Sequence, residues 1–412
     1  MKPTNWFQTF IQDTHYGVRS LRRAPVLAGA VVLILALGIG INTAVFTVID
    51  GFFFRARVEK DPDSFIQLVA LYTGKFEHQE QGWSTSVEDF LAYQARAHSV
   101  SNLAAWGMVH ATMGEDPNPD LDLLVTCNFF ALYGLEHAKL GRLFRPDECS
   151  DPGGAPVVMI SEQMWQRRFA ADPQIVGKAI TLNRHPFRVV GVVPTRFPGH
   201  LKSGVWIPWT MQPVLYGQDF FRESHVPWLT VEGRLESGFS KAAARAELNI
   251  IASQQDRLQP GRKTTLLLTN GSFGQLPAAR STVFWVVLLW MGMVTLVLLL
   301  ICTNVTTLLL SRAAARRQEI AIRLAFGAGR TRLVRMLVTE SLVLASMAGL
   351  MGAYFAYRVP DIVTKLAADK PYYPVKPDLV VFAYLSGITL MAACIAGLAP
   401  ASESLKLDLS TS

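Results

Sequence analysis

Four long apolar runs constrain this chain more than any other feature of its sequence. The runs 26–54 and 283–310 exceed the roughly 20 residues that a helix needs to cross about 30 Å of hydrocarbon. The run 333–357 qualifies if Glu340 is accepted near its start, and 379–398 just reaches the minimum length. With 50% hydrophobic and 17% charged residues, the chain has too much apolar surface for an ordinary soluble protein. The sequence predicts a membrane protein with an α-helical four-span bundle.

The first run raises the alternative of a cleaved signal peptide. Its apolar stretch is about twice as long as an ordinary signal-peptide core, and it begins late in the chain. We therefore expect an uncleaved first span.

Basic residues indicate the orientation of the spans. Lys2, Arg19, Arg22 and Arg23 against Asp13 precede the first run, and seven arginines against two glutamates lie in 312–340. Short loops rich in Lys and Arg stay in the cytoplasm. We therefore expect a multi-pass protein of the inner (cytoplasmic) membrane with both termini cytoplasmic. These two segments together outweigh the net charge of +7, so the basic character does not indicate nucleic acid.

The expected organisation follows from these runs. In chain order it comprises a cytoplasmic amphipathic N-terminal helix (1–25), transmembrane helix 1 (26–54), a periplasmic domain (55–282), transmembrane helix 2 (283–310), a cytoplasmic loop helix (311–332), transmembrane helix 3 (333–357), an outside loop (358–378), transmembrane helix 4 (379–398) and a cytoplasmic tail (399–412). The large extracytoplasmic domain is thus inserted between the first and second spans.

The large segment 55–282 alternates strand and helix signals, which predicts a mixed α/β domain. A buried-strand pattern at 155–160 precedes Ser161, which can cap a helix. Two alternating runs flank 183–186, as in a β-hairpin. A further strand, WLTVEGRL, precedes a helix that opens at Ser240.

Motifs that carry chemistry are missing from this sequence. It has no GxxxxGK[ST] phosphate loop, no GxSxG and no HExxH, and its histidines, among them His78, His110, His185 and His200, lack metal-ligand spacing. We expect no catalytic residue, cofactor or metal in this chain. Cys127 and Cys149 lie in the oxidising compartment, and whether they pair stays open because a domain of this size does not need a disulfide.

Small residues recur at four-residue spacing in three of the runs. The helix-packing candidates are Ala36, Gly40 and Ala44 in the first run, Ala345, Gly349 and Ala353 in the third, and Ala383 and Gly387 in the fourth. Such faces let helices approach closely, either within one four-helix unit or between two copies. Few ionisable groups lie at midplane depth, so an ion pathway is not expected, and Asn42 and Asn304 are expected to form interhelical hydrogen bonds.

The segment RRQEIAIRLAFGAGR, 316–330, predicts a short charged helix between the second and third spans. Ile320 and Leu324 share one face of that helix, and Ile322 and Phe326 share nearly the opposite face. The membrane surface or the chain's own helix ends can cover one apolar face. The other face then favours a cytoplasmic protein partner, although an interfacial helix without a partner remains the alternative.

Several stretches make the whole chain resemble permeases of the MacB and FtsX type. Segment 13–55 resembles the opening of MacB-like permeases that are duplicated in acidobacterial proteins, and 125–144 (VTCNFFALYGLEHAKLGRLF) and 180–197 (ITLNRHPFRVVGVVPTRF) resemble the MacB periplasmic core. Segment 304–345 resembles the FtsX-type stretch in which a coupling helix docks into an ATPase, and 397–410 is similar to the family's ending.

The resemblance implies mechanotransmission. It implies a homodimer, or two permease halves, bound to two copies of a separate ABC ATP-binding subunit, whose ATP-driven movement would reach the outside domain through the second span. The positions that match the ATPase-coupling segment are Glu319, Ile320, Ile322, Arg323 and Leu324. The acidobacterial relatives often hold two such units and this chain holds one, so both a stand-alone permease and half of a duplicated one stay open.

Three roles fit this resemblance. The first is export or efflux with a periplasmic adaptor or other extracytoplasmic protein, the second is FtsX-like regulation of an extracellular partner, and the third is release of lipoproteins. In all three roles the chain is in contact with membrane lipids. An enzymatic role has no residues to support it, and no composition indicates the substrate.

Overall fold

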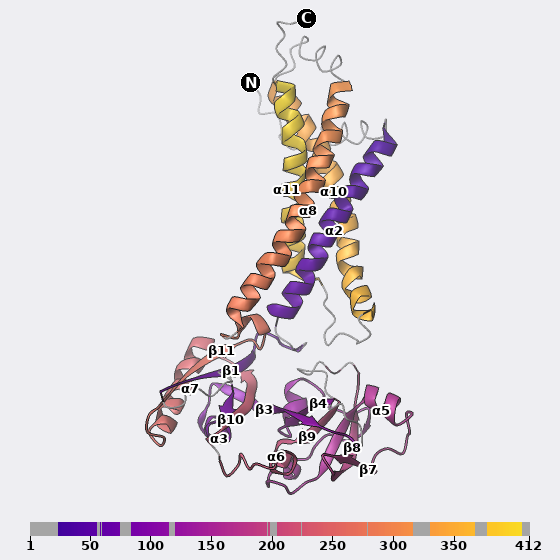
Figure 1. Cartoon of the computed structure of the whole chain (residues 1–412). Coiled ribbons are helices and arrows are strands. Elements are labelled where there is room, and N and C mark those ends of the chain that lie inside the picture. Colours follow the sequence, from indigo (N-terminus) through magenta and orange to yellow (C-terminus); the bar gives the residue numbers. More distant parts are fainter. Residues whose placement is uncertain are drawn as a thin grey trace, which may run out of the picture. The chain divides into compact units, whose positions relative to one another are not determined.

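The computed structural model describes residues 24–55, 58, 60–74, 84–114, 120–195, 197, 204–223, 225–277, 279–315, 330–366 and 377–405. These form two compact units (Figure 1): a helical unit, Met1–Phe52 with Thr282–Ser412, and a sheet unit, Phe53–Ser281. Residues 1–23 of the expected N-terminal helix, residues 316–329 of the expected coupling segment, loop residues 367–376 and tail residues 406–412 lie outside the described ranges.

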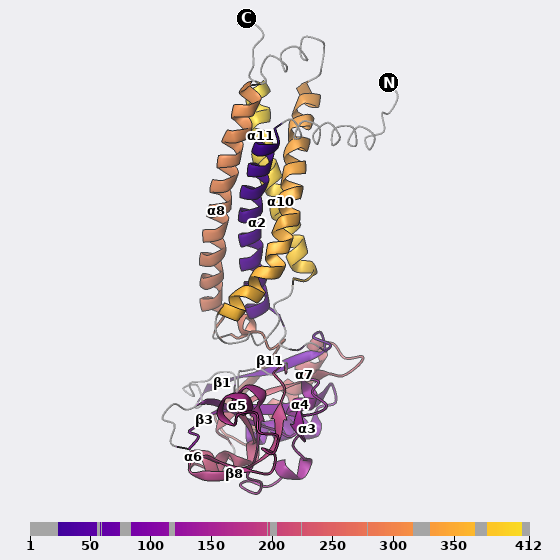
Figure 2. The same cartoon turned by 90° about the vertical axis from the view of Figure 1, so that its right-hand side faces the viewer.

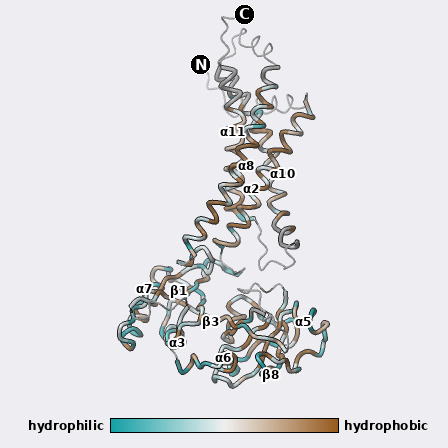
Figure 3. Tube along the Cα trace, viewed as in Figure 1, coloured by the Kyte–Doolittle hydropathy of each residue, from teal (hydrophilic) through white to brown (hydrophobic). Residues whose placement is uncertain are grey.

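The helical unit consists of long apolar helices. They are α2 (Pro25–Phe53), α8 (Arg280–Ala315), α10 (Arg330–Leu366) and α11 (Leu379–Leu405). Each is long and apolar enough to cross a membrane, over Pro25–Phe53, Arg280–Ser311, Val338–Val359 and Leu379–Leu398. Figure 2 shows the four helices side by side, and Figure 3 shows that apolar residues predominate along them. The helical conformation of α8 and α10 extends beyond the apolar runs into their charged flanks.

The sheet unit is built on one mixed sheet. Its strands are β1 (Phe65–Gly74), β2 (Thr85–Ser86), β3 (Val100–Ala111), β4 (Asp120–Val125), β5 (Leu140–Gly141), β6 (Val157–Ser161), β7 (Ala179–Leu182), β8 (His185–Val193), β9 (Val205–Pro208), β10 (Pro227–Leu235) and β11 (Arg262–Thr269). Within the described residues the order is β11-β1-β10-β3-β4-β9-β6-β8-β5, with β2 beside β10 and β7 beside β8. The pairs β4–β9 and β6–β8 are parallel and the others are antiparallel.

Short helices connect these strands. They are α3 (Val87–Arg96), α4 (Phe129–Leu132), α5 (Glu162–Arg168), α6 (Gln212–Tyr216) and α7 (Lys241–Asp256), with 3-10 turns η1 (Pro146–Cys149), η2 (Trp209–Met211) and η3 (Phe273–Gln275). The mixed α/β prediction for this segment is therefore correct.

Alternation along the strands gives the sheet two buried faces. In β4, Leu124 enters one hydrophobic cluster, whereas its neighbours Leu123 and Val125 enter another. Successive side chains of a strand point to opposite faces, so each face forms its own core. The first cluster includes Phe90 of α3 and Leu248 of α7. The second cluster is rich in aromatic residues from α4 and its surroundings.

Local sequence signals place several of these elements. The side chains of Ser161 and Ser240 accept hydrogen bonds from backbone N–H groups at the start of α5 and α7, as predicted. Strands β7 and β8 form the predicted hairpin, in which Asn183 and Arg184 have φ of 47° and 68°. Both turn residues therefore adopt the left-handed region that tight hairpin turns require.

A carboxylate of α7 ties that helix to the start of β3. Glu247 accepts hydrogen bonds from the backbone N–H groups of His98 (3.0 Å) and Ser99 (2.9 Å), and from the Ser99 hydroxyl. Burial alone would raise the pKa of Glu247, but these hydrogen bonds lower it to about 2. The carboxylate form thus stabilises the junction between α3, β3 and α7.

The lowered pKa of Glu247 predicts an acid-dependent loss of stability. Its contribution is present above the ordinary carboxyl pKa of roughly 4.5 and is lost as the pH falls toward 2, at a cost on the order of 1–2 kcal/mol. Urea unfolding of a soluble protein comprising residues 55–279 at pH 5 and pH 2.5 measures this loss. The Glu247→Gln variant should lose less stability between these pH values than the wild type. Equal losses would show that Glu247 does not contribute.

Candidate functional site

Helix α2 is the most enclosed of the four membrane helices. The buried share of its most apolar stretch is 61%, compared with 33% in α10, 33% in α11 and 11% in α8. The packing candidates Ala36 and Ala44 are 1% and 3% exposed. The bundle is thus organised around α2.

Glycines of α2 allow close approach of two other helices. A Cβ on Gly40 would lie 3.1 Å from Cβ of Phe355 and 3.5 Å from Cα of Gly352, both in α10. A Cβ on Gly38 would lie 2.8 Å from a methyl group of Ile301 in α8. Side chains at these two positions would crowd Phe355 of α10 and Ile301 of α8.

A polar contact joins α2 to α11. The Tyr384 hydroxyl donates to Oδ1 of Asn42, and the Tyr384 ring stacks on Phe46 with centroids 4.0 Å apart. The expected interhelical hydrogen bond of Asn42 is confirmed. Its partner, a tyrosine 342 residues further along the chain, carries no sequence signal of its own.

Helix α10 has two small faces. A Cβ on Gly349 would lie 2.9 Å from the Thr389 hydroxyl of α11, and Ala345, one turn earlier, is fully buried. The second face holds Ala348 and Ala356, which are 0% and 1% exposed, and Gly352, which meets Gly40. This second face has the same four-residue spacing of small residues, but it was not predicted.

Two residues that the sequence analysis singled out face away from the bundle. A Cβ on Gly387 of α11 would meet no heavy atom within 4 Å among the described residues. Asn304 of α8 is exposed, and its carboxamide makes no hydrogen bond within the described part of the chain. Among the described residues, Asn304 therefore does not form the expected interhelical hydrogen bond.

The residues predicted to couple to an ATPase, Glu319, Ile320, Ile322, Arg323 and Leu324, lie outside the described ranges. The structure describes the two helices that bracket them, since α8 ends at Ala315 and α10 begins at Arg330.

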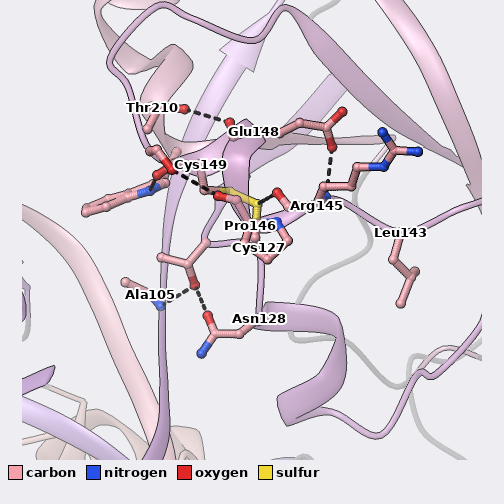
Figure 4. The surroundings of a disulfide bond; sticks show 12 residues. Ala105, Cys127, Asn128, Leu143, Arg145, Pro146, Glu148, Cys149 and Thr210 are labelled. Atoms are coloured by element: carbon pink, nitrogen blue, oxygen red, sulfur yellow. Dashed lines mark hydrogen bonds between the residues drawn. A yellow bond between two sulfur atoms is a disulfide. The ribbon is translucent and has the colours of Figure 1, made fainter.

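A disulfide joins Cys127 and Cys149 in the sheet unit (Figure 4), with their Cα atoms 5.9 Å apart. It links the segment after β4 to η1. Within η1, the carbonyl of Glu148 accepts a hydrogen bond of 3.2 Å from the Thr210 hydroxyl. The sequence left this pairing open. A signal that could have indicated it is that the other two cysteines, Cys302 and Cys394, lie in apolar runs, which leaves Cys127 and Cys149 as the two cysteines of the sheet unit.

Removing the disulfide is expected to destabilise the sheet unit. The bond closes a loop with a sequence separation of 22 residues, so its loss should cost about 3 kcal/mol. Urea unfolding of residues 55–279 with Cys127→Ser and Cys149→Ser measures this cost. Reductant should destabilise the wild type to the same extent and leave the double variant unchanged. A wild type that is insensitive to reductant would contradict the pairing.

A buried charge network lies at the β11 edge of the sheet. Arg262 of β11 donates to both carboxylate oxygens of Asp89 in α3, at 3.0 and 2.9 Å, and to Asp256 of α7 at 2.8 Å. The Arg262 and Asp89 side chains are 2% and 0% exposed. The Tyr72 hydroxyl donates to Asp89 at 3.2 Å, and burial, together with Asp89, raises the pKa of Tyr72 well above its ordinary value. The network joins β1, β11, α3 and α7.

An aromatic cluster fills the second face of the sheet. Phe130 of α4 is fully buried, and its ring centroid lies 5.6 Å from that of Phe129, 5.4 Å from Phe197 and 5.9 Å from Trp206. Aromatic rings in such tilted and edge-on arrangements contribute both buried area and specific contacts. This cluster holds α4 against the strands.

The histidines singled out from the sequence do not gather into a metal site in the described residues. Among them, no group of three or more His, Cys, Asp or Glu side chains could hold a metal ion. His110 and His185 lie within strands β3 and β8, and His78 and His200 are outside the described ranges. The described part of the chain consists of a helical bundle packed around α2 and a folded sheet unit, which the chain joins at the ends of α2 and α8.

Comparison with known families matches both parts of the chain. Residues 28–251, more than half of the chain, match the MacB-like periplasmic core domain, and residues 291–409 match the FtsX-like permease C-terminal family. Together with the four apolar helices, these matches define a multi-pass membrane protein with a large extracytoplasmic domain. The chain belongs to the MacB/FtsX type of ABC transporter permeases.

Individual relatives match this chain over only part of its length. The chain is 25% identical over 297 residues to the macrolide export ATP-binding/permease protein MacB of Burkholderia thailandensis, across 71% of this chain and 43% of that protein. It is 26% identical over 234 residues to the protein of the same name from Escherichia coli, across 55% and 33%. The chain thus spans less than half the length of these curated relatives.

Solved structures of two extracytoplasmic regions also match. The periplasmic region of MacB from Actinobacillus actinomycetemcomitans matches with a TM-score of 0.36 and 17% identity, over 50% of this chain and 89% of that one. The extracellular domain of the noncanonic ABC-type transporter YknZ from Gram-positive bacteria matches with a TM-score of 0.37 and 15% identity, over 49% and 99%.

Proposed function

We propose that this chain is the permease subunit through which a separate ABC ATP-binding subunit moves the sheet unit, in export or efflux. Helix α8 carries this proposal. It is one unbroken helix of 36 residues that begins at Arg280, at the end of the sheet unit, and ends at Ala315, next to the coupling segment. Its length of about 54 Å exceeds the roughly 30 Å of hydrocarbon. A continuous helix of this length can transmit a displacement from one side of the membrane to the other.

The packing around α2 supports the same role. Helix α2 leads directly into the sheet unit at Phe53 and makes close contacts with α8, α10 and α11 through Gly38, Gly40 and Asn42. Packed helices have low compressibility and shift as bodies. A displacement that begins between α8 and α10 therefore reaches α2 as well.

The proposed topology puts the sheet unit on the extracytoplasmic side, inserted between the first and second spans, with both termini in the cytoplasm. The clusters of basic residues before α2 and between α8 and α10 support this orientation. It places residues 316–329 where a cytoplasmic ATPase can reach them.

The proposed partners follow from this topology. Glu319, Ile320, Ile322, Arg323 and Leu324 meet the ATP-binding subunit, and a second copy or a second permease half completes the membrane part. A periplasmic adaptor or other extracytoplasmic protein would meet the sheet unit. The relatives named MacB carry both ATP-binding and permease functions in their names, which supports an ATPase as the partner of this chain.

Affinity capture tests the ATPase partnership. The tagged protein is captured from its native membrane in mild detergent, and the retained proteins are identified by mass spectrometry. The wild type should retain an ATPase with a phosphate-binding loop, and Ile320→Asp or Arg323→Glu should reduce its recovery at least tenfold. The control is Ile250→Asp, which changes an exposed residue of α7. An ATPase retained equally by all variants would contradict the coupling assignment.

A further inference from the structure

The segment that leads from β11 to α8 contacts the end of α2. The Asn270 carboxamide donates a hydrogen bond of 2.9 Å to the backbone carbonyl of Phe54, the residue that follows α2. Gly274 lies against the same turn, since a Cβ on it would be 2.5 Å from the carbonyl oxygen of Phe53. We name residues 270–275 the clasp. The clasp joins the two segments by which the chain enters and leaves the sheet unit.

Hydrogen bonds within the clasp orient its carboxamide. Oδ1 of Asn270 accepts from the backbone N–H of Ser272 at 3.0 Å, and the backbone N–H of Asn270 donates to Oε1 of Gln275 at 3.0 Å. Ser272 is fully buried, and Gly271 has φ of 74°, with no room for a Cβ beside the Phe65 ring. Because the carboxamide oxygen is held by Ser272, its NH2 group faces the end of α2.

The acceptor of this bond is a carbonyl at a helix end. Carbonyl groups at the C-terminal end of a helix have no N–H partner within that helix and carry a partial negative charge. A side-chain N–H is therefore a suitable partner for them. Here the donor lies 216 residues further along the chain than Phe54. The bond consequently ties α2 to the segment that leads into α8, and does not merely close the end of α2.

We propose that the clasp makes the ends of α2 and α8 move as one body where they meet the sheet unit, with Asn270 as the positioning residue. Both of these helix ends lie at the same end of the bundle (Figure 1), so one short segment can serve both. A displacement of α8 then reaches Phe54 through Asn270 and Gly274, in addition to the packing contacts within the membrane. This inference rests on the proposed permease function, because it names the residues by which the movement enters the sheet unit.

Three variants of the full chain separate the bond to α2 from the fold of the clasp itself. Asn270→Asp keeps the acceptor for the Ser272 N–H, but it loses the donor and places a carboxylate at the negative end of α2. Asn270→Ala loses both the donor and the acceptor. Gly274→Ala keeps the carboxamide and displaces the end of α2 sterically.

Two substitutions serve as matched controls. Gln94→Glu adds the same charge as Asn270→Asp at an exposed position of α3. Gly292→Ala adds a Cβ to α8 at a position where it would meet no heavy atom within 4 Å among the described residues. Neither control position belongs to the clasp.

Hydrogen exchange of the full chain in mild detergent, read by mass spectrometry, tests the bond. We expect the amides of the last turn of α2, residues 50–53, to exchange about fivefold faster in the three clasp variants than in the wild type, as for the loss of one hydrogen bond. The controls should match the wild type, and residues 227–235 of β10 should exchange at the wild-type rate in every variant. If Asn270→Ala exchanges faster and Asn270→Asp does not, the turn matters and the bond does not, which overturns the proposal.

A distance measurement tests the movement. A spin label on Ile250→Cys, in the Cys302→Ala, Cys394→Ala background, reports the distance between the sheet units of two copies bound to the captured ATPase, with and without ATP and vanadate. Asn270→Asp should retain the ATPase and its hydrolysis but lose at least half of the shift that the wild type shows. A full shift in Asn270→Asp would overturn the clasp and leave the proposed function standing. A wild type without a shift would reject the proposed function, and the exchange rates would still decide whether Asn270 holds the end of α2.

Discussion

Replacing Arg262 with methionine is expected to lower the free energy of unfolding of the sheet unit by about 3–5 kcal/mol. The substitution leaves Asp89 fully buried without the guanidinium that donates to both of its carboxylate oxygens. It also removes the guanidinium that links Asp89 of α3 to Asp256 of α7. In a unit of this size the melting temperature should fall by about 10 °C. Urea and thermal unfolding of residues 55–279 measure both quantities.

The control for Arg262 is the same substitution at an exposed ion pair. Arg222, whose side chain is 89% exposed, pairs with Asp219 at 3.3 Å. Arg222→Met should change the stability by less than about 0.5 kcal/mol, because exposed ion pairs contribute little. A double variant, Arg262→Met with Asp89→Leu, should recover part of the loss, since it removes the unpaired buried charge. An Arg262→Met protein as stable as Arg222→Met would contradict the importance of the network.

Replacing Phe130 with alanine should cost the sheet unit about 3–5 kcal/mol. The ring is fully buried and contacts Phe129, Phe197 and Trp206, so its removal leaves a cavity among rigid aromatic neighbours that cannot collapse to fill it. The loss should appear in the urea midpoint of residues 55–279 with an unchanged dependence on denaturant concentration.

The matched control for Phe130 is Phe239, which is 43% exposed. Phe239→Ala should alter the stability by less than about 0.5 kcal/mol, as expected for a surface position. Phe130→Leu should lose less than Phe130→Ala because more of the volume is retained. If Phe130→Ala unfolds at the same urea concentration as Phe239→Ala, α4 is not anchored by this cluster.

Much of the fold was predictable from local patterns. Length and apolarity alone locate α2, α8, α10 and α11, because the bilayer imposes one minimum length on every span. Within the sheet unit, Ser161, Ser240 and the turn at Asn183 acted as predicted, since caps and hairpin turns depend on residues close in sequence.

The contacts that sequence reasoning missed join residues far apart in the chain. Asp89 and Arg262 are 173 residues apart, and Asn42 and Tyr384 are 342 apart. The sequence spacing of neither pair predicts the contact, because such pairs form only when the whole fold brings the elements together. The pairing of Cys127 with Cys149 is intermediate, since the oxidising compartment permitted it, the size of the domain left it open, and only the fold places the two residues together.

The membrane contacts divide in the same way. Four-residue spacing of small residues indicated Gly40 and Gly349, and the structure places both against other helices. Gly387 of α11 has the same spacing but faces outward. The second small face of α10, which contains Gly352, was not predicted. Spacing shows that a face permits close approach, but the partner depends on the packing of all helices. The assignment of Glu319, Ile320, Ile322, Arg323 and Leu324 to ATPase coupling remains a prediction.

The central claim is that ATP-driven movement at the coupling segment reaches the sheet unit. Spin labels on Ile250→Cys, in the Cys302→Ala, Cys394→Ala background, report the distance between the sheet units of two copies bound to the captured ATPase. We predict that ATP with vanadate shifts the distance distribution in the wild type, and that Ile320→Asp abolishes the shift. A wild-type distribution that stays the same with and without nucleotide, while the bound ATPase still hydrolyses ATP, would contradict the account.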